Sequence, residues 1–189
     1  MIGVLALQGA FIEHERILRR LGHEVCQVRS AAQLDAVERL IIPGGESTTI
    51  GHLLVTSGLL APIRARAQHG MPVWGTCAGM ILLAKTITDG RPAGQTALEL
   101  MDITARRNAF GRQRESFEAD LSISQLGALP FHAVFIRAPL IEETHGAALP
   151  IATLPDGRIV AVQQGHLLAT SFHPELTADD RLHRYFAAL

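Results

Sequence analysis

The chain has 189 residues, 48% of them hydrophobic, which is enough to bury a substantial core in one domain spanning residues 1–189. Its formal net charge of −1 provides no field for nucleic acid or an anionic membrane surface, so neither is expected as a partner. No stretch approaches the roughly 18 apolar residues of a membrane span, and the apolar start lacks a basic leader.

The first half of the chain alternates strand patterns with helix patterns, which is the rhythm of βαβ units. Short apolar runs predict strands at residues 2–7, 24–28, 39–42 and 73–75. Helical patterns fall between or after them, at residues 11–21, near Ala31, and at 48–57, 60–69 and 80–85. Because strands joined by helices run parallel, this half is expected to form a parallel sheet covered by helices.

Strand patterns dominate after Gly90, with few helices between them. They fall at residues 101–105, 116–123, 133–136, 151–154, 159–163 and 167–171. The end of the chain, residues 179–189, predicts an amphipathic helix with one apolar stripe: Leu182, Tyr185, Phe186 and Leu189. The whole pattern predicts a three-layer α/β/α sandwich, flavodoxin-like, with a mostly parallel central sheet and a partly antiparallel C-terminal extension.

Cys77 stands in a Gly-x-Cys-x-Gly corner between a predicted strand and a predicted helix, flanked by Gly75 and Gly79. This is the pattern of a nucleophile elbow, which exposes one side chain above the sheet edge on strained backbone. The helix N-terminus favours a thiolate there. Cys26 lies in an alternating strand without a glycine turn, so we assign it to packing. Two such cysteines form neither a disulfide framework nor a zinc cluster, which is typical of a reducing cytoplasm.

A cysteine nucleophile needs a base and a group that orients the base. His173 and Glu175 meet this need, because they lie two residues apart at the end of a predicted strand, with Pro174 stiffening the turn. The other histidines have no such partner nearby in the sequence, and none forms a HExxH pair. We therefore predict no metal.

The loop over residues 41–49 follows another predicted strand and contains Gly44, Gly45 and a Ser/Thr cluster. The backbone amides of Gly45 and Ala78 could form an oxyanion hole for a tetrahedral intermediate. Taken alone, the loop is better interpreted as a glycine turn whose Ser/Thr cluster caps a helix.

These segments carry a resemblance across almost the whole chain, at residues 5–10, 43–49, 75–79, 107–113, 135–139 and 170–176. The chain resembles the glutaminase subunits of pyridoxal 5′-phosphate synthases, a branch of the class I (triad) glutamine amidotransferases. The cysteine elbow and His-x-Glu are common to triad amidotransferases. The Leu-Gln-Gly-Ala, Gly-Gly-Glu-Ser-Thr-Thr and Arg-Asn-x-Phe-Gly-Arg-Gln segments characterise the branch.

The resemblance implies that Cys77 is the nucleophile, His173 the acid/base and Glu175 its orienter. It implies that glutamine is held by Gly45, Glu46, Ser47, Arg107, Ile136 and Arg137. An arginine fork matches an α-carboxylate, and Glu46 could accept from the α-ammonium group. Gln8 falls where family members adjust the oxyanion region, whereas Arg106, Arg112 and Arg114 are read as a solvated loop or a docking surface.

The implied reaction hydrolyses L-glutamine to L-glutamate and ammonia through a thioester, with no cofactor. The ammonia passes through a tunnel to a barrel-shaped synthase subunit for pyridoxal 5′-phosphate (vitamin B6) synthesis. Two alternatives remain open: a thiol hydrolase of the DJ-1/PfpI type, and a non-catalytic regulatory subunit. The segment over residues 86–100 is longer than is usual in the family, and its role is left open.

Overall fold

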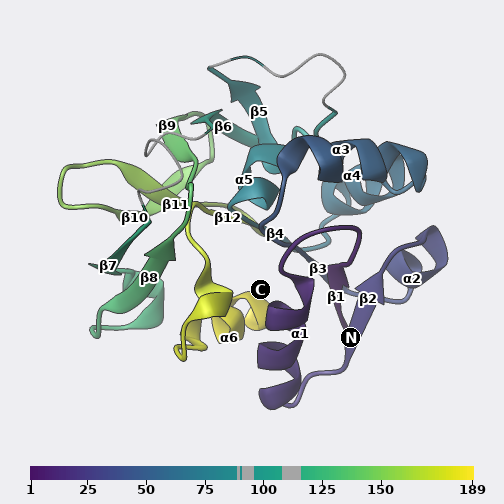
Figure 1. The fold of residues 1–189 in the computed structure, drawn as a ribbon, viewed down its shortest axis with the longest axis horizontal. Helices are drawn as coiled ribbons and strands as arrows, with labels where there is room; N and C mark the ends of the chain where they lie inside the picture. Colours follow the sequence, from purple (N-terminus) through teal and green to yellow (C-terminus); the bar gives the residue numbers. More distant parts are fainter. Residues whose placement is uncertain (89, 91–95, 108–115) are drawn as a thin grey trace.

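The fold is described from a computed structural model, over residues 1–88, 90, 96–107 and 116–189 (Figure 1). Within this part of the chain, the larger sheet has the strand order β2-β1-β3-β4-β12-β11-β9-β6-β5, and β10 pairs with β11. Its parallel portion consists of β2 (Val25–Val28), β1 (Ile2–Leu5), β3 (Arg39–Ile42), β4 (Val73–Thr76) and β12 (Leu167–Thr170).

The second portion of the sheet is mainly antiparallel. β11 (Ile159–Gln164) runs antiparallel to β12, β9 (Leu140–Thr144) and β10 (Leu149–Thr153). β6 (Met101–Arg106) is antiparallel to β9 but parallel to β5 (Ala84–Ile87), and β7 (Phe117–Leu121) pairs with β8 (Phe131–Phe135) in a separate sheet. The predicted parallel sheet with an antiparallel extension is confirmed.

Helices cover both faces of the sheet (Figure 1). One face carries α2 (Ala31–Asp35), α3 (Ser47–Thr56), α4 (Leu60–Gln68) and α5 (Ala78–Leu83), whose buried side chains include Leu34, Leu54, Ile63 and Leu82. The other face carries α1 (Phe11–Arg20) and α6 (Arg181–Ala188), which pack Leu18, Leu182 and Phe186 around Trp74. Each face has its own apolar core, so the three-layer prediction is also confirmed.

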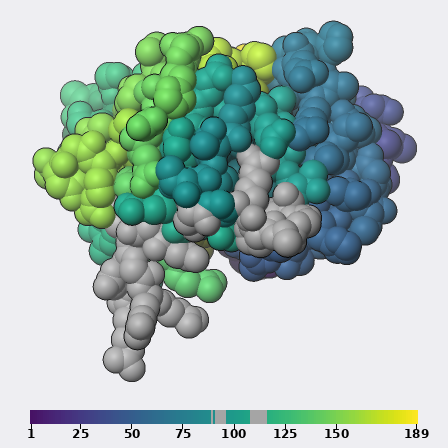
Figure 2. All heavy atoms as spheres, turned by 90° about the horizontal axis from the view of Figure 1, so that it is seen from above, coloured from purple at the N-terminus to yellow at the C-terminus, as the bar shows by residue number. Residues whose placement is uncertain are grey.

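On the surface of the molecule, the elements follow one another as they do along the sheet. Figure 2 shows the blue helices α3 and α4 beside the teal segment that contains β5 and β6, with the green segment of β9 to β11 beyond it. Short 3-10 turns, η1 (Ser124–Leu126) and η2 (Pro174–Leu176), complete the elements. None of the helices in the described ranges is long and apolar enough to cross a membrane.

Two strands were not predicted, β5 and β9. Residues 80–85 were expected to be helical, but α5 ends at Leu83 and the chain extends at Ala84 to pair with β6. β9 escaped notice because Glu142 and Glu143 break its apolar pattern. Glu142 is compensated by Arg106 of the neighbouring strand, whose Nε lies 3.0 Å from its carboxylate. In both strands a tertiary partner outweighs the local pattern.

The parallel strands determine where the site lies. Since they point the same way, the residues that follow β1, β3, β4 and β12 gather at one edge of the sheet. Those residues are the loop of Gln8, the loop of Gly45, Cys77 and His173.

Candidate active site

The elbow at Cys77 combines strain with close packing. Cys77 directly follows β4 and is the N-cap of α5, with φ 48° and ψ −103°, a conformation that L-residues rarely adopt. A Cβ on Gly79 would lie 2.1 Å from the carbonyl oxygen of Ile42, and one on Gly75 would lie 2.5 Å from the backbone of Gly79. The glycines therefore allow the helix to press against β3, whereas the unusual dihedral falls on the cysteine itself.

His173 and Glu175 form a tight pair behind the cysteine. His173 Nδ1 lies 2.7 Å from Glu175 Oε1, and the His173 backbone N–H donates to the Val134 carbonyl at 2.8 Å, which fixes the turn. With Nδ1 occupied by the carboxylate, Nε2 is the ring nitrogen left for Cys77.

The electrostatics of this pair favour its charged form. Burial lowers the pKa of His173, but the Cys77 sulfur and the Glu175 carboxylate together raise that pKa to about 10. Burial raises the pKa of Glu175, but His14 and His173 lower it below the usual value of a glutamate. The imidazole is therefore held ready to carry a proton beside the sulfur.

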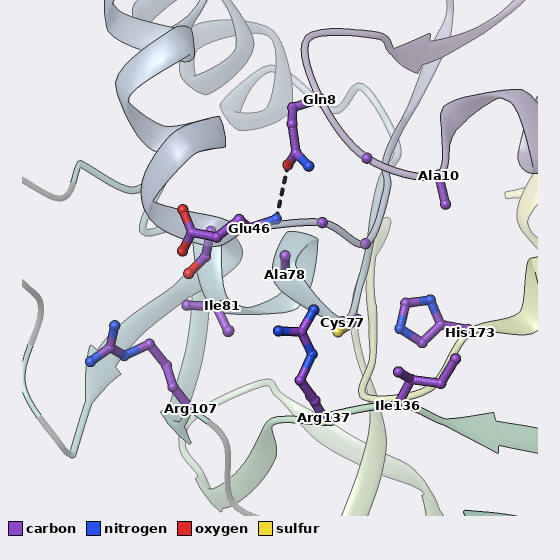
Figure 3. Close-up of a pocket in the computed structure, with 14 residues that line it drawn as sticks. Gln8, Ala10, Glu46, Cys77, Ala78, Ile81, Arg107, Ile136, Arg137 and His173 are labelled. Atoms are coloured by element: carbon purple, nitrogen blue, oxygen red, sulfur yellow. Dashed lines mark hydrogen bonds between the residues drawn. The ribbon is translucent and has the colours of Figure 1, made fainter. Parts of the chain in front are cut away.

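Cys77 and His173 line a cavity of about 440 Å³ (Figure 3), which falls in the range of small-molecule pockets, about 300–1,000 Å³. The same cavity is lined by every residue expected to bind glutamine or to form the oxyanion hole: Gly45, Glu46, Ser47, Ala78, Arg107, Ile136 and Arg137. Glu175 does not reach it. The structure thus brings the predicted site together, with Glu175 as the buried member.

The loop that contains Gly45 is held from the side by the loop after β1. The Glu46 backbone N–H donates to Gln8 Oε1 at 2.8 Å (Figure 3), and the Ala10 N–H donates to the Gly44 carbonyl at 3.0 Å. Gly9 allows this approach, because it has φ +104° and its Cβ would lie 1.9 Å from the Gly44 oxygen. Gln8, whose role the sequence left open, positions the loop of the predicted oxyanion hole.

Glu46 has a structural task besides lining the cavity. Its carboxylate accepts hydrogen bonds from the Thr48 and Thr49 backbone N–H groups at 3.1 and 2.7 Å, and so caps α3. Burial raises the pKa of Glu46, but the bonds from Thr49 and Thr48 outweigh it and lower the value. The expectation that the Ser/Thr cluster supplies the cap is wrong: the threonines donate and Glu46 accepts.

Arg137 is a second strained residue at the cavity, with φ 45° in the turn between β8 and β9, and its side chain points into the pocket (Figure 3). Arg106 instead pairs with Glu142 on the sheet. The predictions for Arg112, Arg114 and most of the motif at residues 107–113 lie outside the described residues, as does part of the segment 86–100.

Two histidines that were not predicted to matter lie behind the predicted triad. Nε2 of His14, on α1, lies 3.4 Å from Glu175 Oε2, and its Nδ1 lies 2.9 Å from Nε2 of His183, on α6, which is 169 positions away in the chain. Their only sequence signal is that each falls on the buried face of an amphipathic helix. Across the described ranges, no group of three His, Cys, Asp or Glu side chains is placed to hold a metal ion.

A cysteine at an elbow with a His–Glu pair beside it is the arrangement of thiol enzymes of the acyl-transfer type. Its fold is that of glutamine amidotransferases. A solved structure described as a glutamine amidotransferase matches with a TM-score of 0.92 and 49% identity, over 99% of this chain and 97% of that one. PurLQS from Thermotoga maritima, at 16% identity and a TM-score of 0.68, shares the fold over 99% of this chain and 96% of its own.

A family model for the SNO glutamine amidotransferase family matches residues 4–188, and the chain belongs to that family. Its relatives include pyridoxal 5′-phosphate synthase subunit PdxT of Herpetosiphon aurantiacus, 66% identical over 100% of this chain and 99% of the relative. The protein of the same description from Chloroflexus aurantiacus is 55% identical with the same coverage.

Proposed function

We propose that the chain is the glutaminase subunit of a pyridoxal 5′-phosphate synthase and hydrolyses L-glutamine through Cys77, His173 and Glu175. The observation that carries the proposal is the 2.7 Å contact between His173 and Glu175 beside a strained cysteine that lines a cavity. Relatives described as PdxT subunits, which match over the whole chain, support the assignment.

In the proposed reaction the Cys77 sulfur attacks the side-chain amide carbon of glutamine, and the carbonyl oxygen becomes an oxyanion. His173 gives its proton to the nitrogen, which leaves as ammonia when the tetrahedral intermediate collapses to a thioester. The same imidazole then takes a proton from water, which attacks the thioester and releases glutamate and the thiolate. Glu175 holds the imidazole in one orientation throughout and stabilises its charged form.

The oxyanion is received by backbone amides. Ala78 is the first residue of α5, so its N–H has no partner within the helix. Gly45, which would supply the second amide, lines the cavity on the loop that Gln8 holds. Two preorganised donors of this kind stabilise a developing charge strongly.

Charged groups at the cavity wall suit the two ends of an amino acid. The Arg137 and Arg107 guanidinium groups match an α-carboxylate, and Glu46 Oε1, which accepts one bond from Thr48, keeps capacity for an α-ammonium group. Ser47 and Ile136 complete the substrate wall.

Ammonia released in water would be lost, so we place the acceptor in a partner: a barrel-shaped synthase subunit that receives ammonia from the cavity. The hydrolysis needs no cofactor or metal. Residues 1–189 act as a single amidotransferase domain, and the free thiols of Cys26 and Cys77 favour the cytoplasm. Membership of the SNO family speaks against the thiol-hydrolase alternative.

The test is glutamate release from glutamine, measured with the chain alone and with the synthase subunit. We expect release with the partner, abolished in Cys77→Ala and retained in Cys26→Ala, which removes the cysteine that packs against the core outside the cavity. Absence of release by the wild-type complex, or release that survives Cys77→Ala, would contradict the proposal and revive the regulatory-subunit alternative.

A further inference from the structure

A line of buried polar groups continues from the triad away from the cavity. Glu175 uses Oε1 for His173, and its Oε2 is buried without a hydrogen-bond partner among the described residues. His14 Nε2 lies 3.4 Å from this oxygen, and both side chains are fully buried, at 0% exposure. The far nitrogen of His14, Nδ1, lies 2.9 Å from His183 Nε2. The line thus joins α6, α1 and the carboxylate that orients the base.

The hydrogen-bonding capacity of the groups at the two ends of this line determines which nitrogen of each histidine carries a proton. A carboxylate oxygen only accepts, so His14 Nε2 must carry the proton that faces Glu175, and Nδ1 of the neutral ring must then accept from His183 Nε2–H. His183 Nδ1, which is buried without a partner in the described part of the chain, is left as a bare acceptor. A proton on His183 Nδ1 would instead be buried with nothing to receive it, which costs more than an unfilled lone pair, and a proton on His14 Nδ1 facing His183 Nε2–H would set two donors against each other.

The surroundings keep both rings neutral. Burial lowers the pKa of His14, with Glu175 and Glu13 acting against burial and His173 with it. Burial also lowers the pKa of His183 well below its usual value, helped by His14 and Arg20. Trp74 packs edge-on against both rings, with centroids 5.7 and 5.0 Å away, and so excludes water from them. The Thr76 hydroxyl, 3.4 Å from His14 Nε2, can donate or accept and so follows the tautomer.

We propose that His14 is a positioning residue for Glu175, which donates its Nε2–H to Oε2, and that His183 holds His14 in the tautomer that makes this possible. At 3.4 Å the contact is longer than a formed hydrogen bond, and catalytic contacts of free enzymes commonly tighten when substrate binds. With both oxygens held, the carboxylate cannot rotate away from His173. The inference rests on the proposed glutaminase function and adds two residues to its machinery.

The kinetic test compares His14→Leu with His14→Gln, each as the full chain with the synthase subunit. Leucine removes the donor, whereas the glutamine amide restores an N–H near Nε2. We expect kcat to fall about ten- to a hundredfold in His14→Leu, with KM for glutamine within about twofold of wild type, because a charge-assisted bond to the orienter is lost. His14→Gln is expected to recover most of that loss.

The matched control is Leu18→Ala, one helical turn further along the same buried face of α1. It loosens the packing of α1 without touching the histidine line, so its melting temperature falls while kcat of the folded protein stays within about twofold of wild type. A purely structural role for His14 would make His14→Leu behave like this control, with kcat of the folded fraction retained. That result would overturn the proposal.

A second measurement needs no variant and no activity. Long-range ¹H–¹⁵N spectra of the imidazole rings in the wild-type chain are expected to show His14 and His183 both neutral and protonated at Nε2. A proton on Nδ1 of either ring would overturn the proposal even if the kinetics agreed. Wild-type complex that releases no glutamate would instead sink the glutaminase function, so the two failures are distinguishable.

Discussion

The two sides of the His173 ring differ in kind. Towards the cavity lie the thiol, backbone amides and charged side chains that line about 440 Å³ of accessible space. Away from the cavity lie Glu175, His14 and His183, which are all buried: 6% of the Glu175 residue, backbone included, is exposed, and 0% of each histidine. The cavity side of the ring can bind and release a substrate, whereas the buried side can only hold the His173 imidazole in place.

The residues on the two sides are also positioned in different ways. Residues on the cavity side are positioned by local backbone devices: the elbow at Cys77, the glycine loop at Gly44 and Gly45, and the strained turn at Arg137. Residues on the buried side depend on the packing of α1 and α6 against the sheet. Substitutions on the two sides are therefore expected to change activity and stability in different ways.

The largest effect is expected on the buried side, from Glu175→Gln. The amide presents an N–H or an oxygen to His173 but no charge, so the imidazolium that forms during the reaction loses its counter-ion. We expect kcat with the synthase subunit to fall about a thousandfold or more, with KM nearly unchanged. The exposed Glu118→Gln serves as control and should keep full activity. A loss smaller than about tenfold would show that Glu175 does not orient the base.

The next effect concerns the loop contact on the cavity side, in Gly9→Ala. A Cβ would lie 1.9 Å from the Gly44 oxygen at φ +104°, so the loops must separate and the predicted oxyanion donor at Gly45 moves. We expect kcat/KM to fall about a hundredfold and the free energy of unfolding by about 2 kcal/mol or more. Gly22→Ala matches it in φ, at +86°, but meets no atom within 4 Å. That control should lose about 1 kcal/mol of stability and no activity.

Arg137→Lys is expected to have a smaller effect, confined to substrate binding. Lysine keeps the charge but loses the planar fork that pairs with a carboxylate. We expect KM for glutamine to rise about tenfold, with kcat changed less. Arg184→Lys, an exposed substitution on α6, should leave both constants unchanged. If kcat fell and KM did not, Arg137 would be acting on the transition state rather than holding the substrate.

The same division explains how far the sequence could be read. Glycine spacing around Cys77 and the His-Pro-Glu turn are local patterns, and they identified Cys77, His173 and Glu175, whereas the glutamine-binding residues followed from the family resemblance. The parallel half of the sheet was also predicted from local patterns, because apolar or alternating strand patterns there are followed by helical patterns. β9 was missed, since Glu142 reads as a solvent residue until Arg106 is placed beside it.

His14 and His183 were missed for a stronger reason. Nothing in the neighbourhood of either residue differs from an ordinary helix, and the contact that gives them meaning joins α1 and α6 only after folding. A capping assignment failed in a similar way: Glu46 and the Ser/Thr cluster were both noted, but which of them accepts depends on the loop conformation.

The smallest expected effect is the contribution of His14 and His183, on the buried side, to the pH dependence of stability. The pKa values of His14 and His183 are lowered in the folded chain, so below about pH 6.5 the unfolded chain takes up protons that the folded chain refuses. A ring that stays neutral in the folded chain lowers the free energy of unfolding by about 1 kcal/mol between pH 6 and pH 5, because the unfolded chain gains a proton there. His173, whose pKa is raised to about 10, is protonated in both states over this window and adds little. Urea unfolding at the two pH values should therefore show a loss that is about 1 kcal/mol larger in the wild type than in His183→Leu. Equal losses in the two proteins would mean that His183 is already protonated inside the fold, and the tautomer chain from α6 to Glu175 would have to be abandoned.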